Sequence, residues 1–503
     1  MTAFILVPGP YTGGWVWQDV AARLREAGAE AHAATLTGMA PDGAAADAEA
    51  DLETHIQDVL DLIDRIDDPE IVLVGHDYGI HPVFGAADRR PERIARIVHA
   101  DAGMARDGAP ALALVPDPTV HEALAAPEDG AHPGPLPAPA TRDDWQRWGS
   151  TEGVTDEAIA RLSRLAAPQP HGTLTQPLKL TGAAAGLPVT GVLCVANGSS
   201  IATLEAVVQL GDPRLQALID PRITFFELAT GHWPMLSAPD TLADVLLAAA
   251  KGDGHRLSRP AEGELPPHLR PFLLDLPEHR RERVGRVDLH LPDADGPRPA
   301  VLFVHGGPVP DGVEPTPRDW PTFIGYGRYA ASRGVVGATL DHRLHEVTAY
   351  PQAHEDVAAA VELLRADPRV DPDRIALWFV SAGGLLSAPW IAGREPWLRC
   401  VAAGYPILAP LPNWGVPEPR FQPVAALGAT DRPPLVLLRM ERERAEIAAT
   451  VAEFLAAAEE TAADIEVIDL PGGVHGFETV DHSEEARDAL GRTMRAVLDR
   501  LGI

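Results

Sequence analysis

Asp77 is one of two residues in this sequence that are well placed to act as a nucleophile. It follows the apolar run 71–74 and lies two residues from each of Gly75 and Gly79. Apolar β-forming residues followed by a glycine-flanked turn predict a buried parallel strand, a sharp turn and a helix. Glycine suits the flanks because the strand and the helix crowd each other there. The alternative interpretation is an ordinary turn with a solvated aspartate.

Ser381 has a similar setting in the second half of the chain. It follows the apolar run 375–380 and precedes Gly383 by two residues, whereas Phe379 stands where a preceding glycine is expected. Serine is a weak nucleophile unless a base removes its proton. His475, in a glycine-rich loop after a predicted strand, is the candidate base. The second half is therefore predicted to carry out nucleophilic hydrolysis.

The acid that would orient His475 is expected directly after the strand predicted at 435–438. Both Glu441 and Glu443 lie there. Such an acid holds the imidazole in place and stabilises its cation. We favour Glu443, and the spacing leaves Glu441 open.

Predicted strands and helices alternate along most of the chain, which favours α/β folds with parallel sheets. The alternation stops at about 102–187, where Pro and Ala are frequent, and we expect a cap insertion there. Both halves repeat one order of features: a glycine-rich loop, a nucleophile turn and a late histidine, which is His232 in the first half. A chain of 503 residues is too long for one typical core. We therefore expect two domains and a lead-in between them, at 1–253, 284–503 and 254–283.

The composition is that of an acidic globular protein. Apolar residues make up 46%, charged residues make up 23%, and the net charge of -30 is spread along the chain. This argues against nucleic acid and anionic membranes as partners. Cys194 and Cys400 lie far apart in apolar runs, so neither a disulfide framework nor a cysteine metal site is expected. Without a visible signal peptide or an apolar run of ~18 residues, we expect a cytoplasmic protein that acts on a small-molecule substrate; a homo-oligomer is left open.

Residues from about 284 to 503 resemble the α/β-hydrolase esterases of the dienelactone-hydrolase and acetyl-esterase type. The similar segments are VLFVHGGP at 301–308, YPQAHEDVAAAVELL at 350–364, DPDRIALWFVSAGG at 371–384 and LPGGVHGFE at 470–478. The resemblance implies hydrolysis of an ester, lactone or similar acyl compound without a cofactor. Backbone N–H groups near Gly307 and of Ala382 are the candidate oxyanion donors, each typically worth ~2.7–4 kcal/mol in the transition state. Phe379 departs from the family pattern and could distort the turn at Ser381.

Residues from about 1 to 250 resemble the small α/β-hydrolases that include plant methyl-ester esterases and hydroxynitrile lyases. The similar segments are FILVPGPYTGGWVW at 4–17, IVLVGHDYG at 71–79, PERIARIVHADA at 91–102 and TGHWPMLSAPD at 230–240. The resemblance implies His232 as base and Asp77 as nucleophile or acid–base group. Most such esterases carry their acid where this chain has the loop 197–200, which has no carboxylate. Asp101, at the end of a predicted strand, is the replacement, as in fluoroacetate dehalogenases; the alternative is a strand-end carboxylate without a catalytic role.

An aspartate nucleophile would attack saturated carbon and form an alkyl-enzyme ester that water then hydrolyses, as in epoxide hydrolases and dehalogenases. Three features of this sequence differ from those of the epoxide hydrolases and dehalogenases and argue against the same mechanism here. Epoxide hydrolases usually open the ring with cap tyrosines, but no tyrosine lies between Tyr78 and Tyr326. Dehalogenases hold halide with Trp or Asn where this chain has Tyr78 and Pro10. The esterases use a backbone N–H at the place of Pro10, together with the one at Tyr78, to bind the oxyanion, and proline has no N–H. The loss of one such donor lowers the rate of ester hydrolysis by ~10²–10³.

We therefore expect two tandem α/β-hydrolase domains, each a mostly parallel sheet flanked by helices, without a metal or cofactor. The second domain is predicted to carry an esterase or lactonase site made of Ser381, His475 and Glu443. The first is predicted to carry a site of the epoxide hydrolase or dehalogenase type made of Asp77, His232 and Asp101.

Two alternatives for the first domain stay open. It could perform acid–base chemistry without hydrolysis, as an isomerase, cyclase or lyase does, or it could be a degenerate domain that binds a ligand or mediates association. Trp145 and Trp148 could line its pocket, although packing of the cap explains them equally well. Fold analogy alone suggests small hydrophobic natural-product intermediates as substrates.

Overall fold

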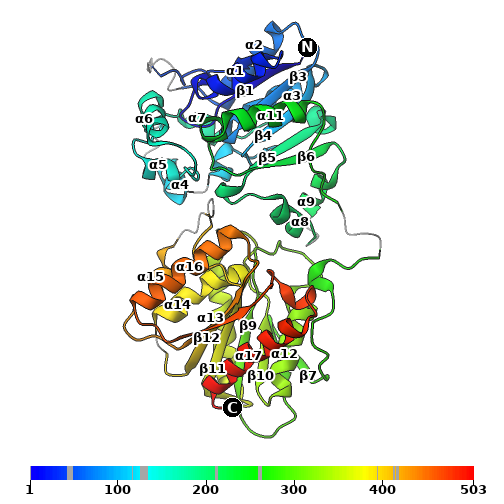
Figure 1. Cartoon of the computed structure of the whole chain (residues 1–503), viewed down its shortest axis with the longest axis vertical. Helices are drawn as coiled ribbons and strands as arrows, with labels where there is room; N and C mark the ends of the chain where they lie inside the picture. Colours follow the sequence, from blue (N-terminus) through cyan, green and yellow to red (C-terminus); the bar gives the residue numbers. More distant parts are fainter. Residues whose placement is uncertain are drawn as a thin grey trace. The chain divides into compact units, whose positions relative to one another are not determined.

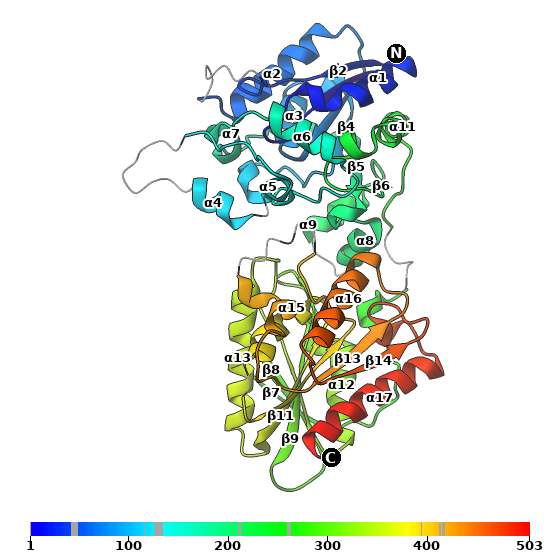
Figure 2. The same ribbon diagram turned by 60° about the vertical axis from the view of Figure 1, so that its left-hand side comes forward.

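The chain forms two compact units in the computed structural model. One unit holds residues 1–208 and 213–259, and the other holds residues 209–212 and 260–503. Figures 1 and 2 show the strands and helices of both units, coloured along the sequence. None of the helices that the structure describes is long and apolar enough to cross a membrane. The described residues are 2–41, 49–115, 117–124, 134–209, 213–258, 263–393, 395–411, 414 and 418–503.

The first unit is built on a six-stranded parallel sheet with the order β2-β1-β3-β4-β5-β6. Every residue of β1 and β3 is buried, as expected for strands that are covered on both faces. The strands are β1 Ala3–Val7, β2 Glu30–Ala33, β3 Ile71–His76, β4 Ile94–Ala100, β5 Val189–Cys194 and β6 Ile223–Leu228.

The order of these strands reverses between β1 and β3. From β1 the chain moves to β2 in one direction, and from β3 it moves to β6 in the other, so right-handed connections place α1 and α3 on opposite faces. In open parallel sheets this reversal creates a crevice at the carboxyl ends of the strands, where ligands bind. The helices that accompany the sheet are α1 Gln18–Glu26, α2 Leu52–Arg65, α3 Ile80–Arg89, α8 Ile201–Gln209, α9 Pro213–Gln216, α10 Pro234–Ser237 and α11 Pro239–Ala250.

Between β4 and β5 the chain leaves the sheet and forms a cap of short helices. These helices are α4 Pro118–Leu124, α5 Arg142–Gln146, α6 Asp156–Leu165 and α7 His171–Thr175. Side chains cap the amino ends of α5 and α6, where Thr141 and Thr155 accept hydrogen bonds from the backbone. Trp145 and Leu162 turn inward and join the same apolar core as the sheet, so the cap is packed onto the first unit.

The second unit has an eight-stranded sheet with the order β14-β13-β12-β11-β9-β10-β8-β7. It is parallel except at β8, which pairs antiparallel with both β10 and β7. The strands are β7 Arg280–Val284, β8 Val287–Leu291, β9 Arg298–Val304, β10 Val336–Leu340, β11 Val370–Val380, β12 Leu398–Gly404, β13 Leu435–Met440 and β14 Ile465–Leu470. The helices are α12 Pro321–Ser332, α13 Tyr350–Ala366, α14 Ala388–Ala392, α15 Pro423–Ala426, α16 Ala445–Glu460 and α17 Glu484–Leu501.

The core of the second unit lies on both faces of its sheet. On β9, Val301 and Phe303 pack in the cluster that includes α12 and α17, whereas Leu302 and Val304 pack in the cluster that includes α13, α14 and α16. This alternation is the two-residue period of a strand that is buried on both sides. The predicted α/β class with mostly parallel sheets is thus confirmed in both units.

The sequence pattern did not predict the edge strand β7. Most of its residues were expected to belong to the lead-in between the two domains. Its sequence, RRERV, has no apolar alternation. Arg281 and Arg283 both form ion pairs with Asp288, a buried residue of β8. Paired charges therefore hold this strand where apolar packing holds the others, and charged residues are common on edge strands because they oppose further pairing.

Candidate active sites

Ser381 lies at the sharp turn that follows β11. Its backbone φ of 53° is in the left-handed region, which residues with a side chain rarely adopt. The loop after β9 passes directly over this turn, because a Cβ on Gly306 would lie only 2.7 Å from the Cβ of Ser381. A strained serine beneath a glycine loop is the local geometry that presents a nucleophile at the end of a strand.

Phe379 does not prevent this turn, although the sequence suggested that it could distort it. In the first unit a Cβ on Gly75, at the corresponding place, would lie 2.6 Å from the Cα of Ile80. In the second unit the turn continues as a 3₁₀ helix, Ser381–Ser387, before α14 begins. The backbone after the turn therefore takes a different course from that in the first unit, and the Phe379 side chain is fully buried.

Ser381, His475 and Glu443 form one line of hydrogen bonds. The Ser381 hydroxyl lies 2.8 Å from Nε2 of His475, and Nδ1 of His475 lies 2.8 Å from Oε2 of Glu443. Glu443 is only 4% exposed and His475 is 25% exposed. This arrangement allows the histidine to take the serine proton while the carboxylate stabilises the resulting cation.

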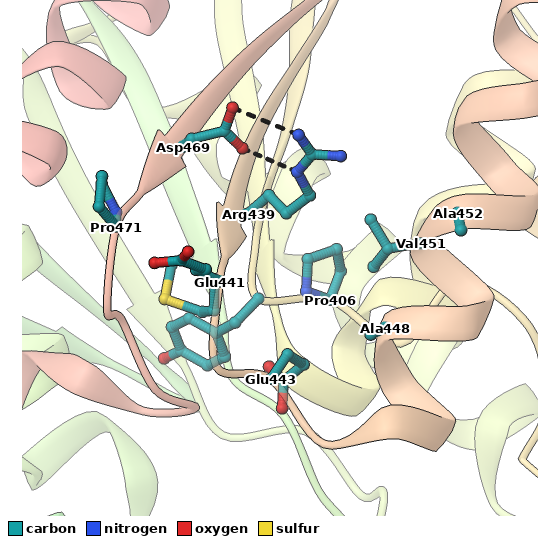
Figure 3. A pocket seen from close by; sticks show the side chains of 11 residues that line it. Pro406, Arg439, Glu441, Glu443, Ala448, Val451, Ala452, Asp469 and Pro471 are labelled. Atoms are coloured by element: carbon teal, nitrogen blue, oxygen red, sulfur yellow. Dashed lines mark hydrogen bonds and ion pairs between the residues drawn. The ribbon is translucent and has the colours of Figure 1, made fainter.

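Glu441 has a different partner. Its Oε2 accepts a hydrogen bond from the backbone N–H of Gly472 at 2.6 Å, so it holds the loop that carries His475. Figure 3 shows Glu441 and Glu443 on the wall of a cavity of about 490 Å³, beside the ion pair of Arg439 with Asp469. Of the two acids that the sequence left open, Glu443 is the one that contacts the histidine.

Asp77 lies at the equivalent turn of the first unit, between β3 and α3. Its φ is 47°, so this turn is also strained. Nε2 of His232 lies 3.1 Å from Oδ2 of Asp77, and Nδ1 lies 2.7 Å from Oδ2 of Asp101. The side chain of Asp77 is 24% exposed, whereas those of His232 and Asp101 are 6% and 4% exposed. One imidazole thus bridges a buried carboxylate and a carboxylate that solvent can reach.

Matches to known protein families are consistent with the geometry of the two candidate sites. Residues 4–245 match the Alpha/beta hydrolase family, and residues 287–392 match the family called BD-FAE. This chain contains two α/β-hydrolase regions. It is accordingly an enzyme of the hydrolase class.

Individual relatives of this hydrolase are esterases by name. The carbendazim hydrolyzing esterase of Nocardioides sp. (strain SG-4G) is 29% identical over 263 residues, which are 49% of this chain and 99% of that protein. Esterase PIR7B of Oryza sativa subsp. japonica is 38% identical over 106 residues, which are 20% of this chain and 38% of that esterase. The solved structure of EstE1, a thermostable carboxylesterase cloned from a metagenomic library, aligns with 21% identity and a TM-score of 0.39 over 46% of this chain and 92% of that chain.

The two carboxylates around His232 set the charge of the first site. Burial lowers the pKa of His232, but the hydrogen bonds and charges of Asp101 and Asp77 outweigh it and raise that pKa to about 10. Burial raises the pKa of Asp77, but the hydrogen bond and charge of His232 hold it below its usual value. At neutral pH the resting site therefore holds an imidazolium next to an ionised Asp77.

Asn197 is a site residue that the sequence analysis missed. It stands at the carboxyl end of β5, where most esterases of this type carry their acid, and its Nδ2 donates to Oδ2 of Asp101 at 2.6 Å. The same nitrogen lies 3.1 Å from Nδ1 of His232, and Oδ1 accepts from the backbone N–H of Ser150 at 2.7 Å. Asn197 therefore fixes the replacement acid and ties the cap to the site. The sequence feature that could have identified Asn197 was its position after a predicted strand, because an amide is not the acid expected there.

Trp145 and Trp148 are both buried in the packing between cap and sheet. Their rings meet the ring of Tyr11 edge-on, with centroid distances of 6.0 and 4.9 Å. Trp145 also packs edge-on against Trp233, which contacts the ring of His232. The two tryptophans expected as pocket residues thus reach the site through Tyr11 and Trp233.

Three further residues near the first turn, Tyr78, His55 and His76, form structural contacts. The hydroxyl of Tyr78 lies 2.8 Å from Nδ1 of the buried His55, so the Tyr78 side chain is anchored to α2. Nε2 of His76 lies 2.7 Å from the backbone carbonyl of His232. The backbone N–H of Tyr78 directly follows the nucleophile and stays the candidate oxyanion donor of this site.

The candidate oxyanion donors of the second site lie at the ends of neighbouring strands. Ala382 is the second residue of the 3₁₀ helix Ser381–Ser387, and backbone N–H groups in the first turn of a helix have no partner within the helix. Its carbonyl accepts a hydrogen bond from the hydroxyl of Tyr350 at 3.0 Å, which fixes the orientation of that peptide. Gly307 lies in the loop after β9, beside the carboxyl end of β11.

Replacing Glu443 by glutamine should lower kcat for a short-chain aryl ester by ~10²–10⁴, because an amide does not stabilise the histidine cation. Glu441→Gln is the matched control. It should cost much less, since Glu441 contacts the loop rather than the imidazole. The measurement is kcat of both variants, once each has been shown to unfold at the same temperature as the parent protein. A larger loss in Glu441→Gln would show that Glu441 is the acid.

Proposed function

We propose that this hydrolase is an esterase or lactonase at Ser381 and that it has a second hydrolytic site at Asp77. The observation that carries the first part is the continuous line of hydrogen bonds from Ser381 through His475 to Glu443. The buried position of Glu443 supports it, because a carboxylate shielded from water stabilises the histidine cation more strongly.

Ser381 attacks the carbonyl carbon of the substrate while His475 takes the hydroxyl proton. The N–H groups of Gly307 and Ala382 bind the oxyanion that forms, which is where such a site gains most of its rate. His475 then gives the proton to the leaving alcohol, and water repeats the sequence on the acyl-enzyme. The match of residues 287–392, which include Ser381, to the BD-FAE family supports this class of reaction.

At the first site the ionised Asp77 attacks a saturated carbon and forms an alkyl ester on its own side chain. Formation of the ester removes the charge of Asp77, which is one of the groups that raise the pKa of His232, and His232 gives its proton to the leaving oxygen or to solvent. Water then attacks the carbonyl carbon of this ester, and the neutral His232 takes a proton from that water. Asp101 holds His232 in place during both steps, and Asn197 fixes Asp101 by donating a hydrogen bond to its carboxylate. The product leaves as an alcohol, and the Asp77 carboxylate is restored.

A second function for the first site is acid–base catalysis without hydrolysis. The observation that favours it is the shortage of backbone donors: Pro10 has no N–H, and the N–H of Tyr11 donates to Gln169 at 2.8 Å. An isomerase, cyclase or lyase that forms no tetrahedral intermediate would not need those donors. Exchange of solvent hydrogen into the substrate or product would identify this chemistry.

A fluorophosphonate probe should label Ser381 and add its mass to the peptide that carries this residue. The reaction requires a serine activated by a histidine, so it tests the proposed esterase site without knowledge of the substrate. Ser387→Ala is the matched control, because Ser387 lies in the same 3₁₀ helix and donates to Gly384 at 2.6 Å. Labelling should persist in this control and vanish in Ser381→Ala. Labelling that maps to another residue would contradict the proposal.

A further inference from the structure

We propose that Tyr11 is the acid of the first site and that the substrate there is an epoxide. In this assignment the Tyr11 hydroxyl protonates the epoxide oxygen while Asp77 attacks the adjacent carbon. The inference rests on the proposed role of Asp77 as nucleophile, and it adds the proton donor and the class of substrate.

The glycine loop of the first unit offers no backbone donor at its centre. Pro10 has no N–H, and the N–H of Tyr11 already donates to Oε1 of Gln169 at 2.8 Å. The carbonyl of Tyr11 accepts from the N–H of Ala167 at 2.9 Å. The cap therefore holds Tyr11 by both of its backbone groups, and a donor to the substrate at this place must come from a side chain.

The backbone of Tyr11 is strained in a way that directs its side chain. Its φ is 62°, in the left-handed region that a residue with a bulky side chain rarely occupies. Asp77, Asp101 and Ser381 share this unusual conformation and lie at the candidate sites; Tyr405, which packs against His475, and Ala462, in a turn after α16, have it as well. Strained residues gather where a fold must aim a functional group.

Segments next to Tyr11 in the chain or against its ring lie beside Asp77 and His232. Its ring meets Trp148 edge-on, and a Cβ on the next residue, Gly149, would lie 2.4 Å from Cγ of His232. A Cβ on Gly9, two residues before Tyr11, would lie 3.3 Å from the Cβ of Asp77. The loop that carries Tyr11 therefore passes beside Asp77, and the cap turn that its ring contacts passes beside His232. The charge of Asp77 also acts on the Tyr11 hydroxyl, because it contributes to the raised pKa of Tyr11.

The Tyr11 hydroxyl is suited to donate. The ring is 3% exposed and held by two tryptophans, and no hydrogen bond joins its hydroxyl to another residue that the structure describes. Burial and then the negative charge of Asp77 raise the pKa of Tyr11, so the phenol keeps its proton in the resting site. An alkoxide is more basic than a phenolate, so transfer to the opened epoxide remains favourable.

The ring-opening step can be written with all protons accounted for. A carboxylate oxygen of Asp77 forms a bond to the epoxide carbon, the carbon–oxygen bond of the ring breaks, and the released oxygen takes the Tyr11 proton. The imidazolium of His232 then returns a proton to the Tyr11 phenolate, which leaves a neutral imidazole. Water attacks the Asp77 ester with that imidazole as base, and the second hydroxyl of the diol takes its proton from the carboxylic acid that forms.

This balance explains why an epoxide fits better than a halide. In the resting site the two carboxylates keep His232 protonated, so it cannot act as a base at the start. Opening an epoxide consumes one proton and thereby produces the neutral histidine that the second step needs. A halide leaves as an anion without a proton, so the first step with a halide does not itself take the proton from His232.

The test compares two alkylating probes in the Ser381→Ala background, with the rate of adduct formation on Asp77 followed by mass spectrometry. Styrene oxide needs a proton on its leaving oxygen, whereas benzyl bromide does not. Tyr11→Phe should slow alkylation by styrene oxide by ~10² or more, the usual size of general acid catalysis, and should leave alkylation by benzyl bromide unchanged. Replacement of Tyr11 by 3,5-difluorotyrosine, a more acidic phenol of similar shape, should preserve or raise the styrene oxide rate.

Each other outcome overturns a stated part of the account. An unchanged styrene oxide rate in Tyr11→Phe, or equal slowing with both probes, would show that Tyr11 is not the acid. An adduct from benzyl bromide but none from styrene oxide in the parent protein would exclude the epoxide. The absence of any Asp77 adduct with both probes would remove the nucleophile itself, and with it the proposed function of this site.

Discussion

Replacing Ser381 by alanine should lower the rate of ester hydrolysis by a factor on the order of 10⁴–10⁶, because the acyl-enzyme can no longer form. The hydrogen bond from the serine hydroxyl to His475 is lost at the same time. His475→Ala should cost nearly as much, and the double variant little more, since the residues of such a relay act as one unit. The measurement is kcat/KM for a short-chain aryl ester, with active-site concentration checked by the fluorophosphonate probe.

Ser387→Ala controls for damage to the 3₁₀ helix and should keep the activity of the parent protein. The side chain of Ser387 is buried and donates to the carbonyl of Gly384, away from the His475 hydrogen bond. If Ser381→Ala hydrolyses the ester at the parent rate, the esterase activity does not belong to this serine. Equal losses in Ser381→Ala and Ser387→Ala would indicate unfolding rather than chemistry.

Replacing His232 by alanine should stop turnover at the first site and leave a stable alkyl ester on Asp77. Attack by the carboxylate needs no base, whereas hydrolysis of the ester does, so only the second step is blocked. We expect the turnover rate to fall by ~10²–10⁴, the range typical of a lost general base. The trapped species is measured as added mass on the peptide that contains Asp77, in the Ser381→Ala background and with an epoxide as substrate.

Asp77→Asn is the matched control for this trap, because it keeps the size of the side chain and removes the charge. It should carry no adduct with or without His232. A mass increase that maps to Asp101 instead would mean that the wrong carboxylate has been assigned. Undiminished turnover in His232→Ala would exclude hydrolysis through an Asp77 ester.

The two sites use equivalent places of the fold for different side chains. Asp101 follows β4 and Tyr405 follows β12, each after the strand next to the nucleophile strand, and both have a positive φ, of 47° and 37°. Asp101 contacts Nδ1 of the histidine directly. Tyr405 instead packs its ring edge-on against His475 with a centroid distance of 4.8 Å, and the acid comes from the loop after β13. The same backbone conformation after this strand therefore occurs both where the strand supplies the acid, as at Asp101, and where the acid comes from another loop, as at Glu443.

The features that could be predicted from the sequence are those with a local signature. Glycines on both sides located the turn at Asp77, because strand and helix leave no room for side chains there. At Ser381 the apolar run and Gly383 were sufficient, although Phe379 takes the place of the first glycine. The order of elements was sufficient to place β13 and therefore Glu443 next to His475. These inferences needed only the rule that carboxyl ends of parallel strands meet at one edge of a sheet.

The residues that escaped prediction depend on contacts between distant segments. Asn197 is unremarkable in its own loop and acquires a role only where β5 ends beside Asp101. In the sequence Tyr11 is only one residue of a glycine loop. Its role depends on hydrogen bonds between its backbone and the distant cap residues Ala167 and Gln169. The strand β7 escaped for a different reason, because ion pairs to Asp288 on the next strand hold it and its sequence has no apolar pattern. Pairing between polar groups has no period in the sequence, so a search for apolar periodicity does not detect it.

The most direct test of the central claim, that Asp77 is a covalent nucleophile, is one turnover of an epoxide in water enriched in ¹⁸O. The protein is used in excess, in the Ser381→Ala background, so that each site reacts once. Attack by water on the Asp77 ester leaves the heavy oxygen in the Asp77 carboxylate, and both oxygens of the diol remain light. We expect one heavy oxygen in the Asp77 peptide and an unlabelled diol, whereas a labelled diol with an unlabelled Asp77 would show that water attacks the epoxide directly and would contradict the account.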